Sequence, residues 1–199
     1  MMHPHVKIIS FMVVLGLIVS GFLVGMDLLT RDRIERNQAY RLQAAILAAN
    51  DYDFTIGNFA EVFEANIDTI ETDEITFYVD QDSGNISFVI EGGGVWGPIT
   101  AVMTLEPDFR TIVAMRVLSQ EETPGLGGVV AEADYLAKYV GVILDPETGI
   151  NITHNPTGAD NEVDAITGGT RTSASFEWMI NQRYQTAKQV WEDRGGDDE

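Results

Sequence analysis

The sequence of 199 residues contains no cysteine and only 12 lysines and arginines, against 31 aspartates and glutamates. The absence of cysteine excludes disulfides, thiolate zinc sites, cysteine-ligated iron–sulfur clusters and c-type haem attachment. With a formal net charge of -19, nucleic acid is not an expected partner, because binding to its phosphate backbone requires clustered lysine and arginine. If this protein carries out redox chemistry, an added organic cofactor must supply it.

Histidine is also scarce, since the sequence contains three and two of them, His3 and His5, precede a long apolar segment. Only His154 lies in the remainder of the chain. A histidine metal site or a pair of catalytic histidines is therefore not expected. Adjacent carboxylates such as Glu121 and Glu122 are more typical of a solvated face than of acid–base chemistry. We assign no catalytic residue and no metal ligand from the sequence.

Residues 8–26 form one long hydrophobic run that contains no charged side chain. A helix of this length spans about 28 Å, which is enough to cross a bilayer. The alternative is a cleaved signal peptide, although the apolar part of such peptides is usually about 7–15 residues long. The sequence divides into a short flank (1–7), a transmembrane helix (8–29), a helical stalk (30–50), a folded domain (51–192) and a disordered acidic tail (193–199).

The charges that flank this run do not settle the orientation in the membrane. Lys7 precedes the run, whereas Arg31, Arg33, Arg36 and Arg41 follow it. Counted literally, the positive-inside rule keeps the following domain in the cytoplasm. The rule is weakest where a long folded domain follows a single span, so charge alone leaves the side open.

After residue 51 the pattern changes to short segments rich in β-branched and aromatic residues, separated by turn residues. It predicts strands at 75–79, 86–90, 99–105 and 112–118, and helices at 129–142 and 174–191. The expected fold class is α+β, an antiparallel sheet packed with helices, preceded by one N-terminal transmembrane helix.

Three glycine-rich segments, 92–98, 122–128 and 167–173, are the strongest candidates for a binding site. Each one alone is more typical of a turn. The third places two glycines and four hydroxyl side chains directly before a predicted helix. Amide hydrogens, the helix dipole and the Arg171 cation would favour a phosphate there, although plain helix capping by Thr172 or Ser173 explains the hydroxyls too. Neither a P-loop nor a dinucleotide fingerprint is present.

Taken together, the three segments resemble an FMN-binding domain. Residues 164–173 resemble its flavin-attachment motif, which reads Asp, two variable residues, Ser or Thr, Gly, Ala, Thr, a variable residue and Ser or Thr. Residues 122–127 are similar to a second hallmark of the family, and residues 94–97 to its glycine and tryptophan turn. Thr167, where serine is commoner, and Gly169, where alanine is usual, depart from the motif.

The resemblance implies that FMN is bound covalently, by a phosphoester to the Thr170 hydroxyl, and that a separate flavin transferase attaches it from FAD. It implies cofactor contacts or recognition roles for the other residues of the three motifs. These residues are Asp164, Thr167, Gly168, Gly169, Arg171, Thr172, Ser173, Glu122, Thr123, Pro124, Gly125, Leu126, Gly127 and Trp96.

The relatives implied by the resemblance are the G-type subunits of Rnf electron transport complexes and the C-type subunits of Na⁺-translocating NADH:quinone oxidoreductases (Nqr). We expect an electron-relaying subunit, not a stand-alone enzyme, anchored once in the inner membrane, with its FMN domain outside the cytoplasm and other membrane subunits as partners. The chain length favours the G type, which is our first prediction, whereas Val95-Trp96 and Gly127-Gly128 favour the C type, which is the alternative. Alternatives are a membrane-tethered binding ectodomain without enzymatic activity and a stand-alone flavin reductase.

Overall fold

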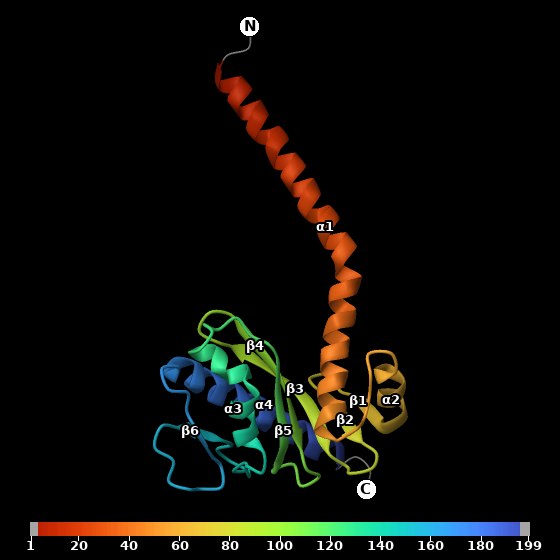
Figure 1. The fold of residues 1–199 in the computed structure, drawn as a ribbon, viewed down its shortest axis with the longest axis vertical. Helices are drawn as coiled ribbons and strands as arrows, with labels where there is room; N and C mark the ends of the chain where they lie inside the picture. The colour runs from red at the N-terminus through yellow and green to blue at the C-terminus, as the bar shows by residue number, and fades with distance from the viewer. Residues whose placement is uncertain (1–3, 196–199) are drawn as a thin grey trace. The chain divides into compact units, whose positions relative to one another are not determined.

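The structure, a computed structural model, describes residues 4–195 (Figure 1). The chain divides into two compact units, Met1–Tyr40 and Arg41–Glu199. The first element, α1 (Pro4–Ala49), is an unbroken helix that runs through the predicted span and the predicted stalk. Its apolar window has a mean hydropathy of 2.6 and none of it is buried in the described structure. The helix is therefore a candidate membrane span with an unpartnered apolar surface.

The folded unit is built on a five-stranded sheet in which neighbouring strands are antiparallel and follow chain order. β-branched and aromatic residues dominate these strands, as expected for side chains that pack on a pleated surface. The prediction of an antiparallel sheet is confirmed, and one further strand, β1, lies at its edge. The strands are β1 (Ile67–Glu71), β2 (Thr76–Asp80), β3 (Ile86–Gly93), β4 (Pro98–Leu105) and β5 (Ile112–Ser119).

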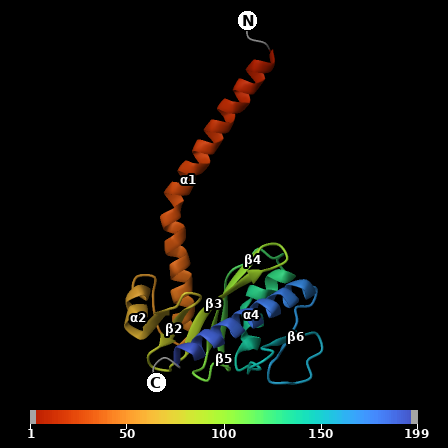
Figure 2. The ribbon, with the colours of Figure 1, turned by 180° about the vertical axis from the view of Figure 1, so that it is seen from behind.

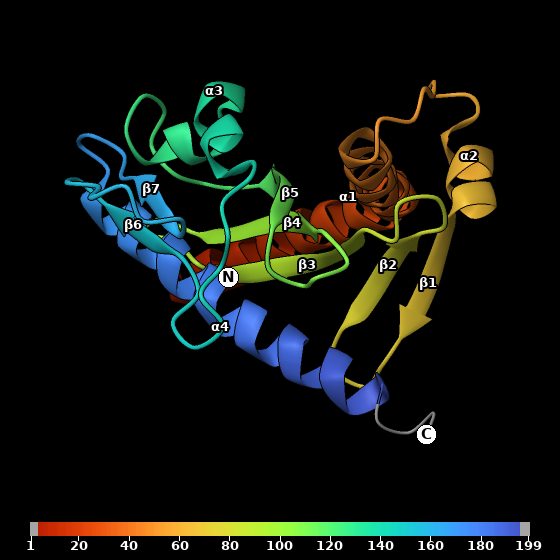
Figure 3. The ribbon, with the colours of Figure 1, turned by 90° about the horizontal axis from the view of Figure 1, so that it is seen from below.

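Both faces of the sheet are covered. On one face lies α4 (Thr170–Gly195), which crosses the strands in Figure 2 and buries Phe176 and Met179 in the same core as Phe88 and Met103. On the other face, the last turns of α1 and the helix α2 (Phe59–Asn66) form a second core with Val102. Figure 3 shows α2 and α4 on opposite sides of the sheet. Side chains alternate between the two faces along each strand and thus pack into two separate cores, one on each face of the sheet.

The prediction of a single helix at 129–142 is wrong. Three short pieces occupy this segment: η1 (Gly127–Ala131), α3 (Ala133–Leu136) and η2 (Ala137–Tyr139). The backbone of Glu132 is extended, with φ -76° and ψ 137°, and separates the first piece from the second. Val140 is extended as well and ends the third. Most of the large apolar residues of the segment are buried in the core, whereas Val140 is exposed, and no single helix carries them.

The segment before α4 contains a small parallel pair of strands, β6 (Asn151–Thr153) and β7 (Glu162–Asp164). This pair aligns Thr153 with Asp164, so that the chain after β6 and the chain after β7 leave the pair in the same direction. Helix α4 begins at Thr170, earlier than the predicted 174, and continues to Gly195. The first residues of the predicted disordered tail are therefore helical, and residues 196–199 lie outside the described residues.

Candidate functional site

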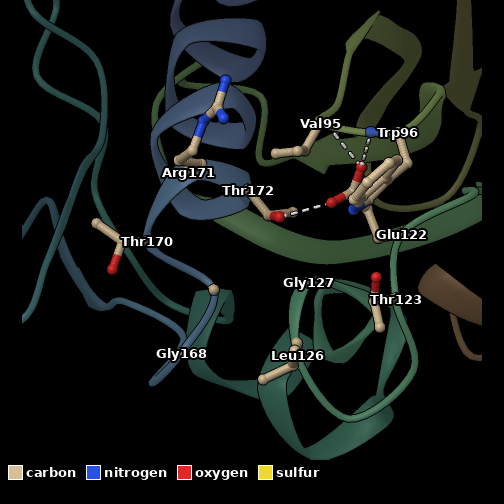
Figure 4. A pocket seen from close by; sticks show the side chains of 11 residues that line it. Val95, Trp96, Glu122, Thr123, Leu126, Gly127, Gly168, Thr170, Arg171 and Thr172 are labelled. Atoms are coloured by element: carbon tan, nitrogen blue, oxygen red, sulfur yellow. Dashed lines mark hydrogen bonds between the residues drawn. The ribbon is translucent and has the colours of Figure 1, made fainter.

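The three glycine-rich segments, far apart in the sequence, meet at the first turn of α4. They line a pocket of about 280 Å³, just below the range for ligand pockets, about 300–1,000 Å³. Figure 4 shows the side chains around it. The lining residues are Val95, Trp96, Glu122, Thr123, Leu126, Gly127, Gly168, Gly169, Thr170, Arg171 and Thr172.

Glu122 joins the three segments to one another. Its side chain is buried, with 4% exposed, and one oxygen, Oε1, accepts hydrogen bonds from the backbone N–H groups of Val95 (2.7 Å) and Trp96 (3.0 Å). The other oxygen, Oε2, accepts one from the Thr172 hydroxyl at 2.6 Å, and these bonds are drawn in Figure 4. A buried carboxylate requires such partners. The solvated face expected for Glu121 and Glu122 is therefore wrong for Glu122, whereas Glu121 is exposed. The hydrogen-bonding capacity of Glu122 is largely used in holding the pocket walls together.

The ionisation of Glu122 follows from the same contacts. Burial raises the pKa of the carboxyl, but the hydrogen bonds from Thr172, Trp96 and Val95 oppose that effect and outweigh it, so the pKa lies below its usual value. Hydrogen bonds donated to a carboxylate favour its charged form. Glu122 is therefore an ionised, hydrogen-bonded anchor at neutral pH.

Two glycines allow the close approach of the walls. A Cβ on Gly127 would contact the Thr172 hydroxyl and the Glu122 carboxylate, so the 122–127 loop can reach α4 only with glycine at this position. A Cβ on Gly169 would lie 2.8 Å from Cγ2 of Ile166, a buried side chain. The space at residue 169 is thus already tight without the alanine that is usual in the motif.

Thr170 and Thr172 lie two residues apart in the first turn of α4 but occupy different environments. The Thr172 hydroxyl is buried against Glu122, whereas Thr170 is exposed and lies on the other side of the helix start in Figure 4. The Oγ1 atom of Thr170 is 3.2 Å from Nε2 of His154. The first turn of a helix leaves backbone N–H groups without intrahelical acceptors and carries partial positive charge. An anion attached at Thr170 would meet that charge.

The mouth of the pocket carries exposed apolar side chains. Trp96 is 71% exposed and Leu126 is 47% exposed, although both line the pocket. Apolar groups that face a pocket are typical of ligand sites. Arg171 is exposed, and Figure 4 shows its guanidinium pointing away from the 122–127 loop. Its charge is near the pocket, but in this conformation its side chain is directed to solvent.

Five of the residues implied by the resemblance do not line the pocket. Asp164 forms an ion pair with Lys138 at 3.3 Å. Ser173 is buried, and its hydroxyl accepts a hydrogen bond from the Ile166 N–H at 3.0 Å. The remaining three, Thr167, Pro124 and Gly125, are exposed and absent from the lining.

Sequence reasoning did not assign two residues of the site. Val95 lies within the glycine and tryptophan turn and lines the pocket, so the motif itself contained the signal. His154 lies outside every motif and is brought to Thr170 by the β6–β7 pair. No local sequence signal predicts that contact.

The fold and the pocket define a cofactor- or ligand-binding α+β domain whose site is built by three glycine-rich segments at a helix N-terminus. Residues 94–185 match the model of the family described as FMN-binding domain. The resemblance predicted from the three motifs is therefore confirmed for the part of the chain that contains the pocket.

Two relatives that are similar in sequence are consistent with this family match. The chain is 29% identical over 137 residues to the C-type subunit (NqrC) of the Na(+)-translocating NADH-quinone reductase of Pasteurella multocida, covering 63% of this chain and 47% of that protein. It is 33% identical over 104 residues to the protein of the same name from Vibrio vulnificus, covering 48% of this chain and 41% of that one. The chain thus spans less than half the length of these two relatives.

Solved structures support the fold. NqrC of Shewanella oneidensis superposes with a TM-score of 0.66 at 20% identity, covering 75% of this chain and 93% of that chain. The corresponding subunit of the Na(+)-translocating NADH-quinone reductase from Parabacteroides distasonis superposes with a TM-score of 0.64 at 18% identity, covering 75% and 90%. The α+β fold predicted from the sequence is confirmed by these likenesses.

The residues at the pocket fit FMN. The site combines an exposed hydroxyl at a helix N-terminus, a neighbouring arginine, and exposed apolar side chains at the mouth. A helix N-terminus is suited to a phosphate, and exposed apolar surface is suited to a flat aromatic ring. A Cβ at Gly127 or Gly169 would meet neighbouring side chains at less than 3 Å, so both positions keep the walls of the pocket close together.

Proposed function

We propose that this protein carries FMN as a phosphoester on the Thr170 hydroxyl. The observation that carries the proposal is the environment of that hydroxyl: it is exposed, it lies at the first residue of α4 and it borders the pocket of the segment matching FMN-binding domains. Thr172, the other threonine of this turn, is buried and its hydroxyl donates a hydrogen bond to the Glu122 carboxylate. Thr170 is thus the better acceptor by exposure.

The surrounding residues have distinct roles in this proposal. The N–H groups of the first turn of α4 and the Arg171 side chain would balance the phosphate charge. Trp96 and Leu126 would cover the flavin ring. Glu122 would hold the glycine and tryptophan turn and the first turn of α4 in place on either side of it. FMN, when bound, supplies one- and two-electron transfer. The protein contributes attachment, orientation and a partly apolar surrounding.

The relatives and α1 support a cellular role that we also propose. We propose a membrane-anchored electron carrier in an ion-translocating complex of the NADH-quinone reductase type, with FMN reduced by one neighbouring subunit and oxidised by another. The apolar part of α1 contains no charged residue, so it offers an anchor and no ion path. The G-type role in an Rnf complex uses the same domain chemistry. Identification of the copurifying subunits decides between the two.

The attachment is tested by coexpressing the full chain with a flavin transferase and examining it on a denaturing gel under ultraviolet light. Covalent flavin survives denaturation, and the intact mass should rise by one FMN less one water. Thr170→Ala should lose both signals, whereas Thr172→Val should keep them. A noncovalent binding domain, the competing proposal, would release all flavin on denaturation and give the same unmodified mass for every variant.

We further propose that the FMN domain lies outside the cytoplasm, as the family resemblance implies. Ser119→Cys places a thiol on an exposed residue at the end of β5, in a protein with no other cysteine. A membrane-impermeant maleimide added to intact cells with a permeabilised outer envelope should label it. Labelling only after the inner membrane is disrupted would place the domain in the cytoplasm.

A further inference from the structure

The His154 side chain forms a hydrogen bond with the Thr170 hydroxyl. The distance from Nε2 of His154 to Oγ1 of Thr170 is 3.2 Å. His154 follows the last residue of β6, Thr153, which pairs with Asp164 of β7. Both residues of the contact are exposed. The imidazole and the hydroxyl are therefore open to a second protein while they remain in contact with each other.

We propose that His154 is the general base that activates Thr170 for flavin attachment, a role that rests on the proposed function and adds a catalytic residue to it. A threonine hydroxyl is a weak nucleophile and is activated by an adjacent base within hydrogen-bond reach. With Nε2 unprotonated, the imidazole accepts the Thr170 hydroxyl proton. Under this proposal the acceptor protein, and not only the transferase, contributes a catalytic group.

The transfer step balances with FAD as the donor. Thr170 Oγ1 attacks the phosphorus on the FMN side of the pyrophosphate and forms a new P–O bond. The bond from that phosphorus to the bridging oxygen breaks, and AMP leaves with the bridging oxygen. The Thr170 proton passes to His154 Nε2 and then to solvent. No group is oxidised or reduced.

Charged side chains of both signs lie on the segments next to His154. They are Glu162 and Asp164 on β7, Lys138 on η2, which forms an ion pair with Asp164, and Arg171 and Glu177 on α4. The helix N-terminus and Arg171 stabilise the phosphate, which leaves His154 free to act on the proton. After the transfer, a protonated His154 would lie beside the new phosphodiester and stabilise its negative charge.

The test measures the rate of flavin attachment to the purified full chain in detergent, with one flavin transferase and FAD in fixed amounts. The readouts are gel fluorescence and intact mass against time. His154→Ala and His154→Gln should slow attachment about 100-fold, within the range of general acid–base catalysis. Asn155→Ala is the matched control, because it truncates the next exposed residue of the same loop and should keep the wild-type rate.

Two further readouts separate a base from a structural role. Imidazole added to His154→Ala should raise the rate several-fold and leave the Asn155→Ala rate unchanged. The ratio of the wild-type rate to the His154→Gln rate should rise as the pH is raised from acid to neutral, because a general base acts only in its unprotonated form. Because both rates use the same transferase, the ratio cancels the transferase's own pH dependence.

The outcomes are distinguishable. A wild-type chain that gains no flavin mass overturns the proposed function itself. A modified wild-type chain with His154 variants at the wild-type rate overturns the role of His154 and leaves the proposed function standing. Slow variants without imidazole rescue, and with a rate ratio independent of pH, also overturn it, because they show a role in positioning alone.

Discussion

The first turn of α4 has two sides with opposite properties. On the buried side, Thr172 donates to Glu122, which in turn holds the N–H groups of Val95 and Trp96. On the exposed side, Thr170 contacts His154 and is open to solvent. Two threonines separated by a single residue thus have different roles. The buried side builds the pocket, and the exposed side offers the reactive hydroxyl.

The comparison implies that stability and flavin attachment should separate under mutation. Substitutions on the buried side should lower the free energy of unfolding, because they leave polar groups without partners or force the walls apart. Substitutions on the exposed side should leave stability almost unchanged and affect attachment. We expect the largest loss of stability at Glu122, a smaller one at Gly127 and then at Thr172, and the smallest change from acid pH.

Glu122→Ala should cost the most stability. It removes the acceptor for Val95, Trp96 and Thr172 at once, and hydrogen bonds to charged groups contribute about 1.5–3 kcal/mol each. We expect a loss of about 3 kcal/mol or more, measured by denaturant unfolding of the detergent-solubilised chain. Glu121→Ala, a change at the exposed neighbour, is the control. Equal stability of the two variants would contradict the anchoring role of Glu122.

Gly127→Ala should be the next most damaging. Its new methyl group would press on the Thr172 hydroxyl and the Glu122 carboxylate, and overpacking of this kind costs about 1–3 kcal/mol. Gly93→Ala is a matched control, because a Cβ there meets no atom within 4 Å. A wild-type unfolding midpoint for Gly127→Ala would show that the two walls are not in close contact.

Thr172→Val and Thr170→Val compare the two sides directly. Thr172→Val should lower the free energy of unfolding by about 1–2 kcal/mol, since it leaves a buried carboxylate with one donor fewer. Thr170→Val changes an exposed residue and should stay within about 0.5 kcal/mol of wild type. The flavin measurements should show the reverse pattern. If both variants lose stability equally, the two hydroxyls do not differ as the structure indicates.

The pH dependence of Glu122 gives the smallest effect. Its pKa is lower in the folded protein than the ordinary value of a glutamate, so its contribution to stability is complete above that ordinary value. The contribution is lost as the pH falls through the lower, folded value. The stability difference between wild type and Glu122→Gln should therefore be constant at about pH 6–8 and shrink in acid. A difference that grows in acid would show that folding raises the pKa of Glu122 and does not lower it.

The fold class was predictable from the sequence because β2 to β5 carry strong local signals. Their β-branched and aromatic runs are bounded by turn residues. Weaker signals were missed: β1 is polar at Asp68, Thr69 and Glu71, and β6 and β7 have three residues each. The predicted helix at 129–142 was wrong, since extended backbone at Glu132 divides the segment and packing overrides its apolar period.

In the site, too, short sequence motifs were predictable, whereas contacts between residues far apart in the sequence were not. The three glycine-rich segments were identified from motif residues, and the structure brings parts of all three to one pocket. The bond between Glu122 and Thr172 spans 50 positions and the contact between His154 and Thr170 spans 16. Both contacts depend on how the elements pack, so their geometry was beyond a reading of the sequence.

The most direct test of the central claim is to locate the flavin by peptide mass spectrometry after digestion with trypsin. Cleavage after Lys138, Arg171 and Arg183 places Thr170 in the peptide 139–171 and Thr172 in the peptide 172–183. We expect the mass of one FMN less one water on the first peptide, with fragment ions that assign it to Thr170. Flavin on the second peptide, or on neither, would contradict the account.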